Sequence, residues 1–228
     1  RCNLRCVHCY SGSTDRQYAG ELTTDEGLRL IDALAAFGAP VILFSGGEPL
    51  LRPDLPDLIR HATGRGLRAV ISTNGTLITP AAAARLKELN LSYVGVSLDG
   101  TQAVNDRFRG VPGAYAQALA GIRACRAAGL KVGLRFTINR RNAGEIPAIF
   151  QLLEDEDIPR ACFYHLVYSG RGSKLIGEAL GLEETRRAVG QIIDLTASLH
   201  RRGMPKEIIT VDNHADGVFL YLRLLRED

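Results

Sequence analysis

Short apolar runs alternate along the chain with longer stretches in which apolar residues recur every three or four positions. Short runs bounded by Gly, Pro, Asn or Asp are typical of buried strands, whereas the longer spacing is typical of helices that bury one face. The pattern predicts five strands, within residues 40–47, 67–75, 91–100, 130–139 and 160–166. It predicts helices within residues 22–38, 53–66, 79–90, 113–129, 143–156 and 182–203, and a further helix at the end of the sequence, within 217–228.

Capping residues indicate where several of these helices begin. Thr24 is expected to cap the first helix and Asp54 the second, because their side-chain oxygens can accept hydrogen bonds from free backbone N–H groups. Thr79 precedes Pro80, a residue favoured in the first turn of a helix. These signals support helices between the predicted strands.

Strands that alternate with helices of this length predict an α/β fold with a parallel sheet and outer helices. We expect a partial (β/α)6 barrel similar to a TIM barrel. Its first strand would precede residue 1, because the cysteine-rich opening segment stands where the loop after a first strand belongs. Functional residues of parallel barrels gather at the carboxyl ends of the strands. The polar stretches "SGGEP", "STNG", "SLDG" and "HLVYSGRG" all lie at such ends.

Charge and composition indicate which classes of molecule the protein could bind and in which compartment it could work. Of the 228 residues, 46% are apolar and 23% charged, and 28 Lys and Arg face 25 Asp and Glu with no polybasic run. The longest apolar window, 33–44, is interrupted by Gly38 and Pro40 and is too short to span a membrane. We expect a soluble protein without a nucleic-acid or membrane partner. The odd number of cysteines, five, favours a reducing compartment such as the cytoplasm over a disulfide scaffold.

Three of the cysteines, Cys2, Cys6 and Cys9, form a C-x3-C-x2-C motif at the start of the chain. A structural zinc site needs a fourth ligand, and His8 is the only local candidate. Three thiolates on a four-iron cluster would instead leave one iron open to a substrate or cofactor. The spacing alone leaves three interpretations open: a cluster, a zinc site, or buried structural thiols.

A second motif, Gly46-Gly47-Glu48-Pro49, follows the first predicted strand. Two glycines let the backbone approach a ligand closely, and an ionised Glu48 could accept hydrogen bonds from an ammonium group. The alternative is a tight turn with a solvated carboxylate.

Alternation within the strands assigns side chains to the two faces of the sheet. In "LSYVGVSLDG" the residues Val94, Val96 and Leu98 share one face, which leaves Ser97 and Asp99 on the other. Because apolar residues should face the helices, the polar pair is expected inside the barrel.

The same reasoning places Arg135 inside the barrel, where a guanidinium needs an anion. That anion is either a ligand carboxylate or an interior Asp or Glu. Ser72 and Asn74 in "ISTNG" are also expected on the inner side, unless this stretch is a plain turn.

Together these motifs resemble those of radical S-adenosylmethionine (SAM) enzymes. In that family a [4Fe-4S] cluster on three cysteines binds SAM through its open iron and splits it to a 5′-deoxyadenosyl radical. The resemblance implies that Cys2, Cys6 and Cys9 are the cluster ligands and therefore the catalytic centre. His8 stands where the family usually has an aromatic carbocycle, a mild departure because imidazole is also planar.

The resemblance also implies a SAM-binding set. Glu48 would receive the SAM ammonium, Ser97 and Asp99 the sugar, and Arg135 the carboxylate. His165 is expected to contact adenine or substrate, or else to be an ordinary interior histidine. The complete set is Gly46, Gly47, Glu48, Ser72, Asn74, Ser97, Asp99, Arg135 and His165.

Later stretches, chiefly "FYHLVYSGRG" and "VDNHADG", are similar to those of radical SAM enzymes of haem d1 biosynthesis. This similarity implies a tetrapyrrole substrate derived from didecarboxysirohaem, with hydrogen abstraction from propionate side chains that are then lost or converted. Arg109 and Arg171, both expected in loops at the active end, and His214 are the candidate substrate contacts.

The resemblance further implies a domain division. Residues 1–205 would form the core barrel and 206–228 the start of a truncated C-terminal extension, which in this family binds an auxiliary iron-sulfur cluster. After Cys9 only Cys125 and Cys162 remain, and both are expected in the core. That cluster would therefore lie in a region absent from this chain, or else the protein does without it. A ferredoxin or flavodoxin is the expected electron donor. A radical SAM peptide maturase and a zinc-binding module are the alternatives.

Overall fold

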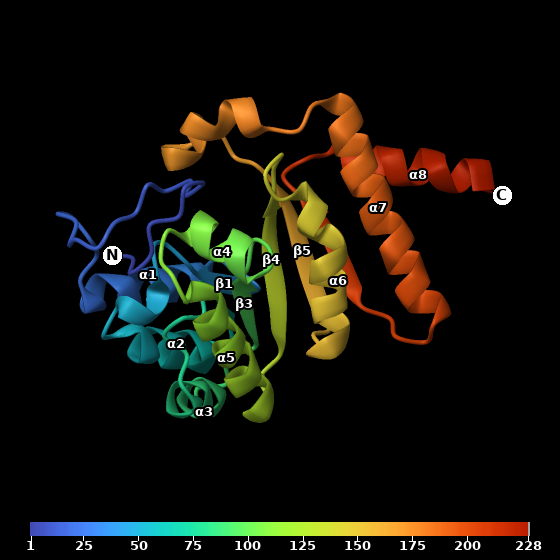
Figure 1. Cartoon of the computed structure of the whole chain (residues 1–228). Helices are drawn as coiled ribbons and strands as arrows, with labels where there is room; N and C mark the ends of the chain where they lie inside the picture. The colour runs from blue at the N-terminus through green and yellow to red at the C-terminus, as the bar shows by residue number, and fades with distance from the viewer. Residues whose placement is uncertain (228) are drawn as a thin grey trace.

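A computed structural model describes residues 1–227 as a curved parallel sheet flanked by helices (Figure 1). The strands are β1 (Val41–Phe44), β2 (Arg68–Thr73), β3 (Tyr93–Ser97), β4 (Val132–Ile138), β5 (Arg160–His165) and β6 (Glu207–Val211). The α-helices are α1 (Thr24–Ala36), α2 (Leu55–Gly64), α3 (Pro80–Glu88), α4 (Gln102–Arg109), α5 (Ala114–Ala127), α6 (Ile146–Asp155), α7 (Leu182–Arg201) and α8 (Ala215–Glu227). Short 3-10 helices are η1 (Pro49–Leu51), η2 (Ala143–Glu145) and η3 (Gly170–Glu178).

The six strands pair in chain order, β1-β2-β3-β4-β5-β6, and every pairing is parallel. Since β1 and β6 are the two ends of that order, the barrel is open. The predicted α/β class with outer helices is confirmed. The parallel arrangement brings all strand carboxyl ends to one edge, where the N-terminal segment lies beside η3 (Figure 1).

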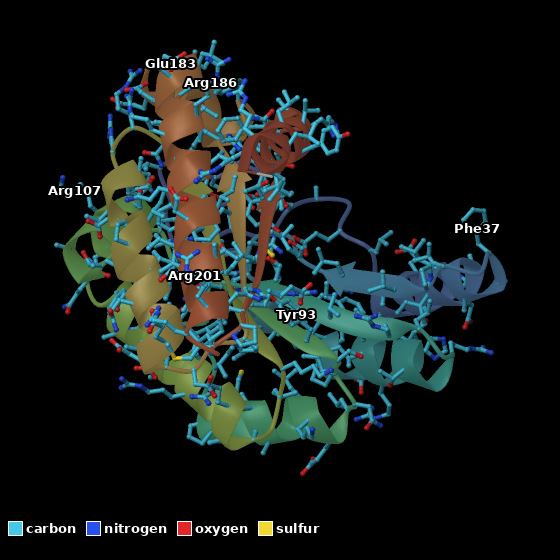
Figure 2. The ribbon with its side chains drawn as sticks, turned by 90° about the vertical axis from the view of Figure 1, so that its right-hand side faces the viewer. Phe37, Tyr93, Arg107, Glu183, Arg186 and Arg201 are labelled. Atoms are coloured by element: carbon cyan, nitrogen blue, oxygen red, sulfur yellow. The ribbon has the colours of Figure 1, made fainter. Side chains whose placement is uncertain are left out.

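The predicted alternation is confirmed on β3. Val94, Val96 and Leu98 are fully buried in the core between sheet and helices. On the inner face, Gly95 leaves room for Arg135, because a Cβ at Gly95 would lie 2.9 Å from the Arg135 Cδ. Charged side chains such as Glu183, Arg186 and Arg201 lie on the outer helix α7 (Figure 2).

Two elements were missed by the sequence analysis. The expected count of five strands was wrong, because residues 207–211 form β6 and pair with β5 in the register Arg160↔Glu207. The run "EIITV" is short and follows a helix without a long apolar stretch, so periodicity did not reveal it. Helix α4, with only three buried residues in eight, was likewise missed, and Arg109 ends this helix instead of lying in a loop.

The first helix is capped one residue earlier than expected. Thr23, not Thr24, accepts a hydrogen bond from the Glu26 N–H, and the Glu26 side chain accepts one from the Thr23 N–H. This reciprocal capping box needs a spacing of three residues, which Thr23 and Glu26 have. Asp54 precedes α2 without a side-chain cap and pairs with Arg52 instead, whereas Thr79 caps α3 as expected.

Within residues 1–227, no helix combines the length and the apolar character that a membrane span requires.

Close packing of α5 on the turn after β2 yields a stability prediction. A Cβ on Gly121 would lie 2.4 Å from the Gly75 carbonyl oxygen, whereas Gly64 at the end of α2 has no such neighbour within 4 Å. We expect Gly121→Ala to lower the unfolding free energy by about 1–3 kcal/mol, because overpacking outweighs the helix propensity of alanine. Gly64→Ala should be neutral or stabilising by up to about 1 kcal/mol. Urea denaturation of both variants checks this, and equal stability of the two would contradict the packing argument.

Candidate active site

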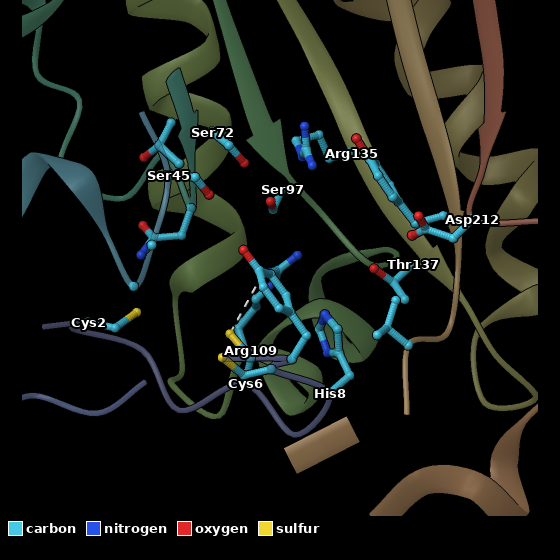
Figure 3. A pocket seen from close by; sticks show the side chains of 18 of the residues that line it. Cys2, Cys6, His8, Ser45, Ser72, Ser97, Arg109, Arg135, Thr137 and Asp212 are labelled. Atoms are coloured by element: carbon cyan, nitrogen blue, oxygen red, sulfur yellow. Dashed lines mark hydrogen bonds between the residues drawn. The ribbon is translucent and has the colours of Figure 1, made fainter. Parts of the chain in front are cut away.

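A cavity of about 370 Å³ opens at the carboxyl ends of the strands (Figure 3). Most of the predicted site residues line it, namely Cys2, Cys6, Cys9, Gly46, Gly47, Ser72, Asn74, Ser97, Arg109, Arg135 and His165. Four others are not part of the lining, namely Glu48, Asp99, Arg171 and His214.

The three cysteines form one wall of this cavity, because Cys9 packs against the small buried cluster that contains Cys2 and Cys6. Their thiols are free, with Cys2 and Cys6 buried and Cys9 half-buried. Burial raises the pKa of Cys2 above its ordinary value. At Cys9 burial also acts to raise the pKa, but hydrogen bonding by Ser11 and Ser13 outweighs it and the pKa of this thiol is lowered.

The cysteine segment packs against three turns at positions where only glycine fits. A Cβ on Gly47 would lie 2.1 Å from the Arg1 carbonyl oxygen, and one on Gly110 would lie 2.8 Å from that of Arg5. At Gly170 the corresponding distance to the Tyr10 carbonyl oxygen is 2.3 Å. Gly110 and Gly170 also have φ values of 70° and 55°, a left-handed conformation that favours glycine. These turns determine where the thiols lie.

Arg171 also holds the cysteine segment in place. Its Nε donates to the Cys6 carbonyl oxygen at 2.7 Å, and its Nη1 donates to the Ser13 carbonyl oxygen at 2.9 Å. The guanidinium therefore holds the cysteine segment from outside the cavity lining. A contact with substrate stays a prediction for this residue.

Glu48 is not part of the cavity lining, and its hydrogen bonds connect its own turn to β2. Its carboxylate accepts hydrogen bonds from the Thr73 hydroxyl at 2.7 Å, the Asn74 N–H at 2.8 Å and the Leu50 N–H at 3.1 Å. The side of the motif exposed to the cavity is formed by Ser45, Gly46 and Gly47. Burial raises the pKa of Glu48, and the three hydrogen bonds oppose the rise.

The opposite wall carries Ser97, Arg135 and Thr137 from the inner face of β3 and β4 (Figure 3). The Arg135 guanidinium lies 4.5 Å from the centre of the Tyr164 ring, a cation–π contact. Among the described residues no Asp or Glu forms an ion pair with Arg135, so the alternative of an interior salt bridge is not observed. This cation is available to an anionic ligand.

Asn74 lines the cavity and also reaches the cysteine segment. Its Nδ2 donates to the Asn3 Oδ1 at 2.8 Å, and its Oδ1 accepts from the Thr76 N–H at 2.9 Å. These hydrogen bonds of the amide hold the turn after β2 against the N-terminal segment.

Asp99 lies behind the cavity wall, fully buried. Its Oδ2 is 2.6 Å from Nη2 of Arg109 and 3.2 Å from Nε2 of His8. Arg109 is itself buried, and its Nη1 lies 3.7 Å from the Cys6 sulfur (Figure 3). Burial lowers the pKa of His8, an effect opposed by the Asp99 charge. The expected contact of Asp99 with a sugar therefore competes with an existing ion pair.

Two histidines have different surroundings. His165 lines the cavity, and its Nε2 is 2.7 Å from Oδ2 of the buried Asp216. His214 is exposed on the loop before α8, so a role as substrate ligand remains only a prediction.

Sequence reasoning missed Tyr164 and Asp212, which line the cavity from β5 and from the residue after β6. Asp212 has φ of 70°, which is uncommon outside glycine and is a signal that only the structure provides. The expectation that both remaining cysteines lie in the core was correct for Cys125, which is fully buried. It was wrong for Cys162, which is half-buried on the inner face of β5, in register with Arg135.

The residues present fit the expected iron-sulfur cluster. In a four-iron cluster each thiolate binds its own iron, so the sulfur atoms need to share a cavity wall, not a single point. Cys2, Cys6 and Cys9 do share such a wall, and within residues 1–227 no three His, Cys, Asp or Glu side chains group around one ion. The backbone at Gly46 and Gly47 and the unpaired Arg135 cation provide polar groups for a zwitterionic cofactor beside it.

Gly170, at the start of η3, yields a prediction for the iron and sulfide content of the protein. In Gly170→Ala the new methyl group would overlap the Cys9 and Tyr10 carbonyl oxygens, at 2.5 and 2.3 Å, and displace the third thiol. We expect this variant to lose most of its iron and sulfide after anaerobic reconstitution. Gly177→Ala, in the same short helix with no neighbour within 4 Å, should retain both. Full iron content in Gly170→Ala, measured by iron and sulfide assays, would refute this role of Gly170.

The buried Glu48 carboxyl yields a pH prediction. A carboxyl whose pKa rises on folding contributes stability that is present below its ordinary pKa and is lost as pH rises through the raised value. We expect the unfolding free energy of the cluster-free wild type to fall relative to Glu48→Gln as pH rises above about 4, the ordinary pKa of a glutamate, because burial raises the pKa of Glu48 in the folded state. Glu26→Gln is a control of opposite sign, because hydrogen bonds from Thr23 lower the pKa of the exposed Glu26. Parallel pH profiles of wild type and Glu48→Gln, in denaturant titrations, would contradict the prediction.

Comparisons with known proteins identify the family of this chain. A family model described as the radical SAM superfamily matches residues 1–153. The chain is 60% identical over its whole length to Fe-coproporphyrin III synthase of Methanosarcina barkeri and covers 57% of that protein. It is 45% identical over 96% of its length to pre-heme d1 synthase of Dinoroseobacter shibae and covers 54% of it. The chain thus spans about half the length of these curated relatives.

The fold also matches a solved structure. Streptococcus suis SuiB bound to S-adenosylmethionine superposes with a TM-score of 0.79 over 93% of this chain and 48% of SuiB. At 18% identity this match supports the fold alone. From the matching family model and the 60% identical relative, the chain belongs to the radical SAM superfamily.

Proposed function

We propose that this chain is the catalytic core of a radical SAM enzyme of haem biosynthesis, acting on carboxylate side chains of an iron tetrapyrrole. The observation that carries the proposal is the cavity itself. Three free thiols form one wall, and an arginine without an acidic partner among the described residues stands on the strands opposite. When bound, the cluster would supply the electron that cleaves SAM to a 5′-deoxyadenosyl radical.

The chain's own residues would hold and orient the reactants. Cys2, Cys6 and Cys9 would ligate the cluster, and the backbone at Gly46 and Gly47 would approach the SAM amino acid closely. Arg135 would pair with the SAM carboxylate, because its half-buried guanidinium lies over the Tyr164 ring and a guanidinium can donate two parallel hydrogen bonds to a carboxylate. Ser72 and Ser97 would donate hydrogen bonds to the sugar.

The relatives support a tetrapyrrole substrate and suggest which product to examine first. The higher identity is to Fe-coproporphyrin III synthase, at 60% against 45% for pre-heme d1 synthase. We therefore propose formation of Fe-coproporphyrin III from a didecarboxysirohaem-derived substrate as the first candidate. Conversion of propionate side chains toward haem d1 is the second, supported by the "FYHLVYSGRG" and "VDNHADG" stretches. We further propose a ferredoxin or flavodoxin as electron donor.

The test is an anaerobic incubation of the reconstituted full-length protein with SAM, a strong reductant and didecarboxysirohaem. We expect 5′-deoxyadenosine and a lighter tetrapyrrole that co-elutes with Fe-coproporphyrin III, detected by chromatography with mass spectrometry. A product that matches pre-haem d1 selects the second candidate. An unchanged tetrapyrrole mass would reject both and favour a peptide-modifying enzyme.

Cys6→Ala provides the matched control. With two thiolates left, we expect loss of the cluster absorbance and of 5′-deoxyadenosine formation. Cys125→Ala removes a thiol from the core, outside the cavity, and should keep both. Undiminished SAM cleavage in Cys6→Ala, or zinc without iron in the wild type, would overturn the ligand assignment.

A further inference from the structure

We propose that Arg109 raises the reduction potential of the cluster held by the three cysteines, and that Asp99 positions Arg109 for this purpose. The inference rests on the proposed function, since it assumes that the three thiols bind an iron-sulfur cluster. It assigns Arg109 a role at the metal centre in place of the substrate contact expected from the sequence.

The position of Arg109 is unusual for a cation. It ends α4, and its side chain is buried with 9% exposure. Nη1 lies 3.7 Å from the Cys6 sulfur and Nη2 lies 2.6 Å from the Asp99 carboxylate, so the planar group joins the thiol to the acid. Its Nε is buried and has no hydrogen-bond partner among the described residues. A guanidinium is rarely buried without a counter-charge, and here the contacts are one carboxylate and one sulfur.

Asp99 is itself held rigidly. Its Oδ1 accepts the Thr137 N–H at 3.0 Å, and its backbone N–H donates to the Asn105 Oδ1 at 3.0 Å. Its carbonyl oxygen accepts from the Asn142 Nδ2 at 3.1 Å. The carboxylate therefore has little freedom to move, and the guanidinium it pairs with is directed toward Cys6.

The charge of Arg109 favours the reduced state of a cluster on Cys6. Reduction adds one negative charge to the cluster, and hydrogen bonds or cations at its sulfur ligands stabilise that charge. Because the site is buried, the attraction is screened less than it would be at the surface. The Asp99 charge offsets part of the effect, but the guanidinium is the group in contact with the sulfur.

A purely structural role predicts something different. The cysteine segment already bonds to α4 through the backbone, since the Arg5 N–H donates to the Arg109 carbonyl oxygen at 3.0 Å and the Val7 N–H to that of Phe108 at 2.9 Å. These bonds do not use the Arg109 side chain. If the side chain served only to anchor the segment, a variant that assembles the cluster would show an unchanged potential.

The experiment compares Arg109→Gln and Arg109→Lys with the wild type and with Arg107→Gln. Arg107 is on the same helix but exposed to solvent (Figure 2), so its variant removes the same charge away from the cavity. Each reconstituted protein is assayed for iron and sulfide. Each is then titrated with reductant at controlled potential, without substrate, while the EPR signal of the reduced cluster is recorded.

We expect Arg109→Gln to lower the ratio of reduced to oxidised cluster at a given potential at least about tenfold, which is 59 mV for a one-electron couple. Arg109→Lys should give a smaller shift in the same direction, and Arg107→Gln should match the wild type. Loaded Arg109 variants with the wild-type potential would overturn the proposal. So would failure of both Arg109 variants to load a cluster that Arg107→Gln retains, since Arg109 would then be an assembly anchor. A wild type that binds no cluster would instead reject the proposed function.

Discussion

The site depends on close backbone contact between the N-terminal segment and three turns. At Gly47, Gly110 and Gly170 a carbonyl oxygen of that segment occupies the space that a Cβ would fill. The turns come from distant parts of the chain, after β1, after α4 and after β5. Because each contact leaves no room for a side chain, the turns determine where the thiols lie along the cavity wall. Everything proposed about the metal centre presupposes this positioning.

Buried ionisable side chains also hold the site in its arrangement. Glu48, Asp99 and Arg109 are all buried behind the cavity lining or within its wall, and each is paired or hydrogen-bonded. A buried charge without partners would be costly, so these groups hold their neighbours in definite positions. Glu48 connects the Gly-Gly turn to β2, and Asp99 connects β4 to the cysteine segment through Arg109. Arg135 differs from them, because it has an aromatic neighbour but no acidic one among the described residues.

Much of the fold followed from periodicity, because strands and helices of a layered α/β protein bury their faces at regular spacings. The assignment of Ser97, Arg135 and the thiols to one cavity also followed from pattern and motif. Alternation fails where a strand ends: β3 stops at Ser97, so the direction of Asp99 is determined by the loop beyond it. Arg171 meets Cys6 across 165 residues of sequence, a contact that no local pattern contains. The strand β6 was hidden for a similar reason, since its short half-buried run depends on pairing with β5.

Asp212 imposes a restriction that concerns evolution more than catalysis. Its left-handed backbone, at φ of 70°, admits glycine, asparagine and aspartate readily and β-branched residues hardly at all. During evolution, this aspartate in the cavity lining can therefore be replaced by asparagine or by glycine. An isoleucine or a threonine at this position would require a different loop conformation. The backbone geometry therefore keeps branched side chains out of this part of the cavity lining.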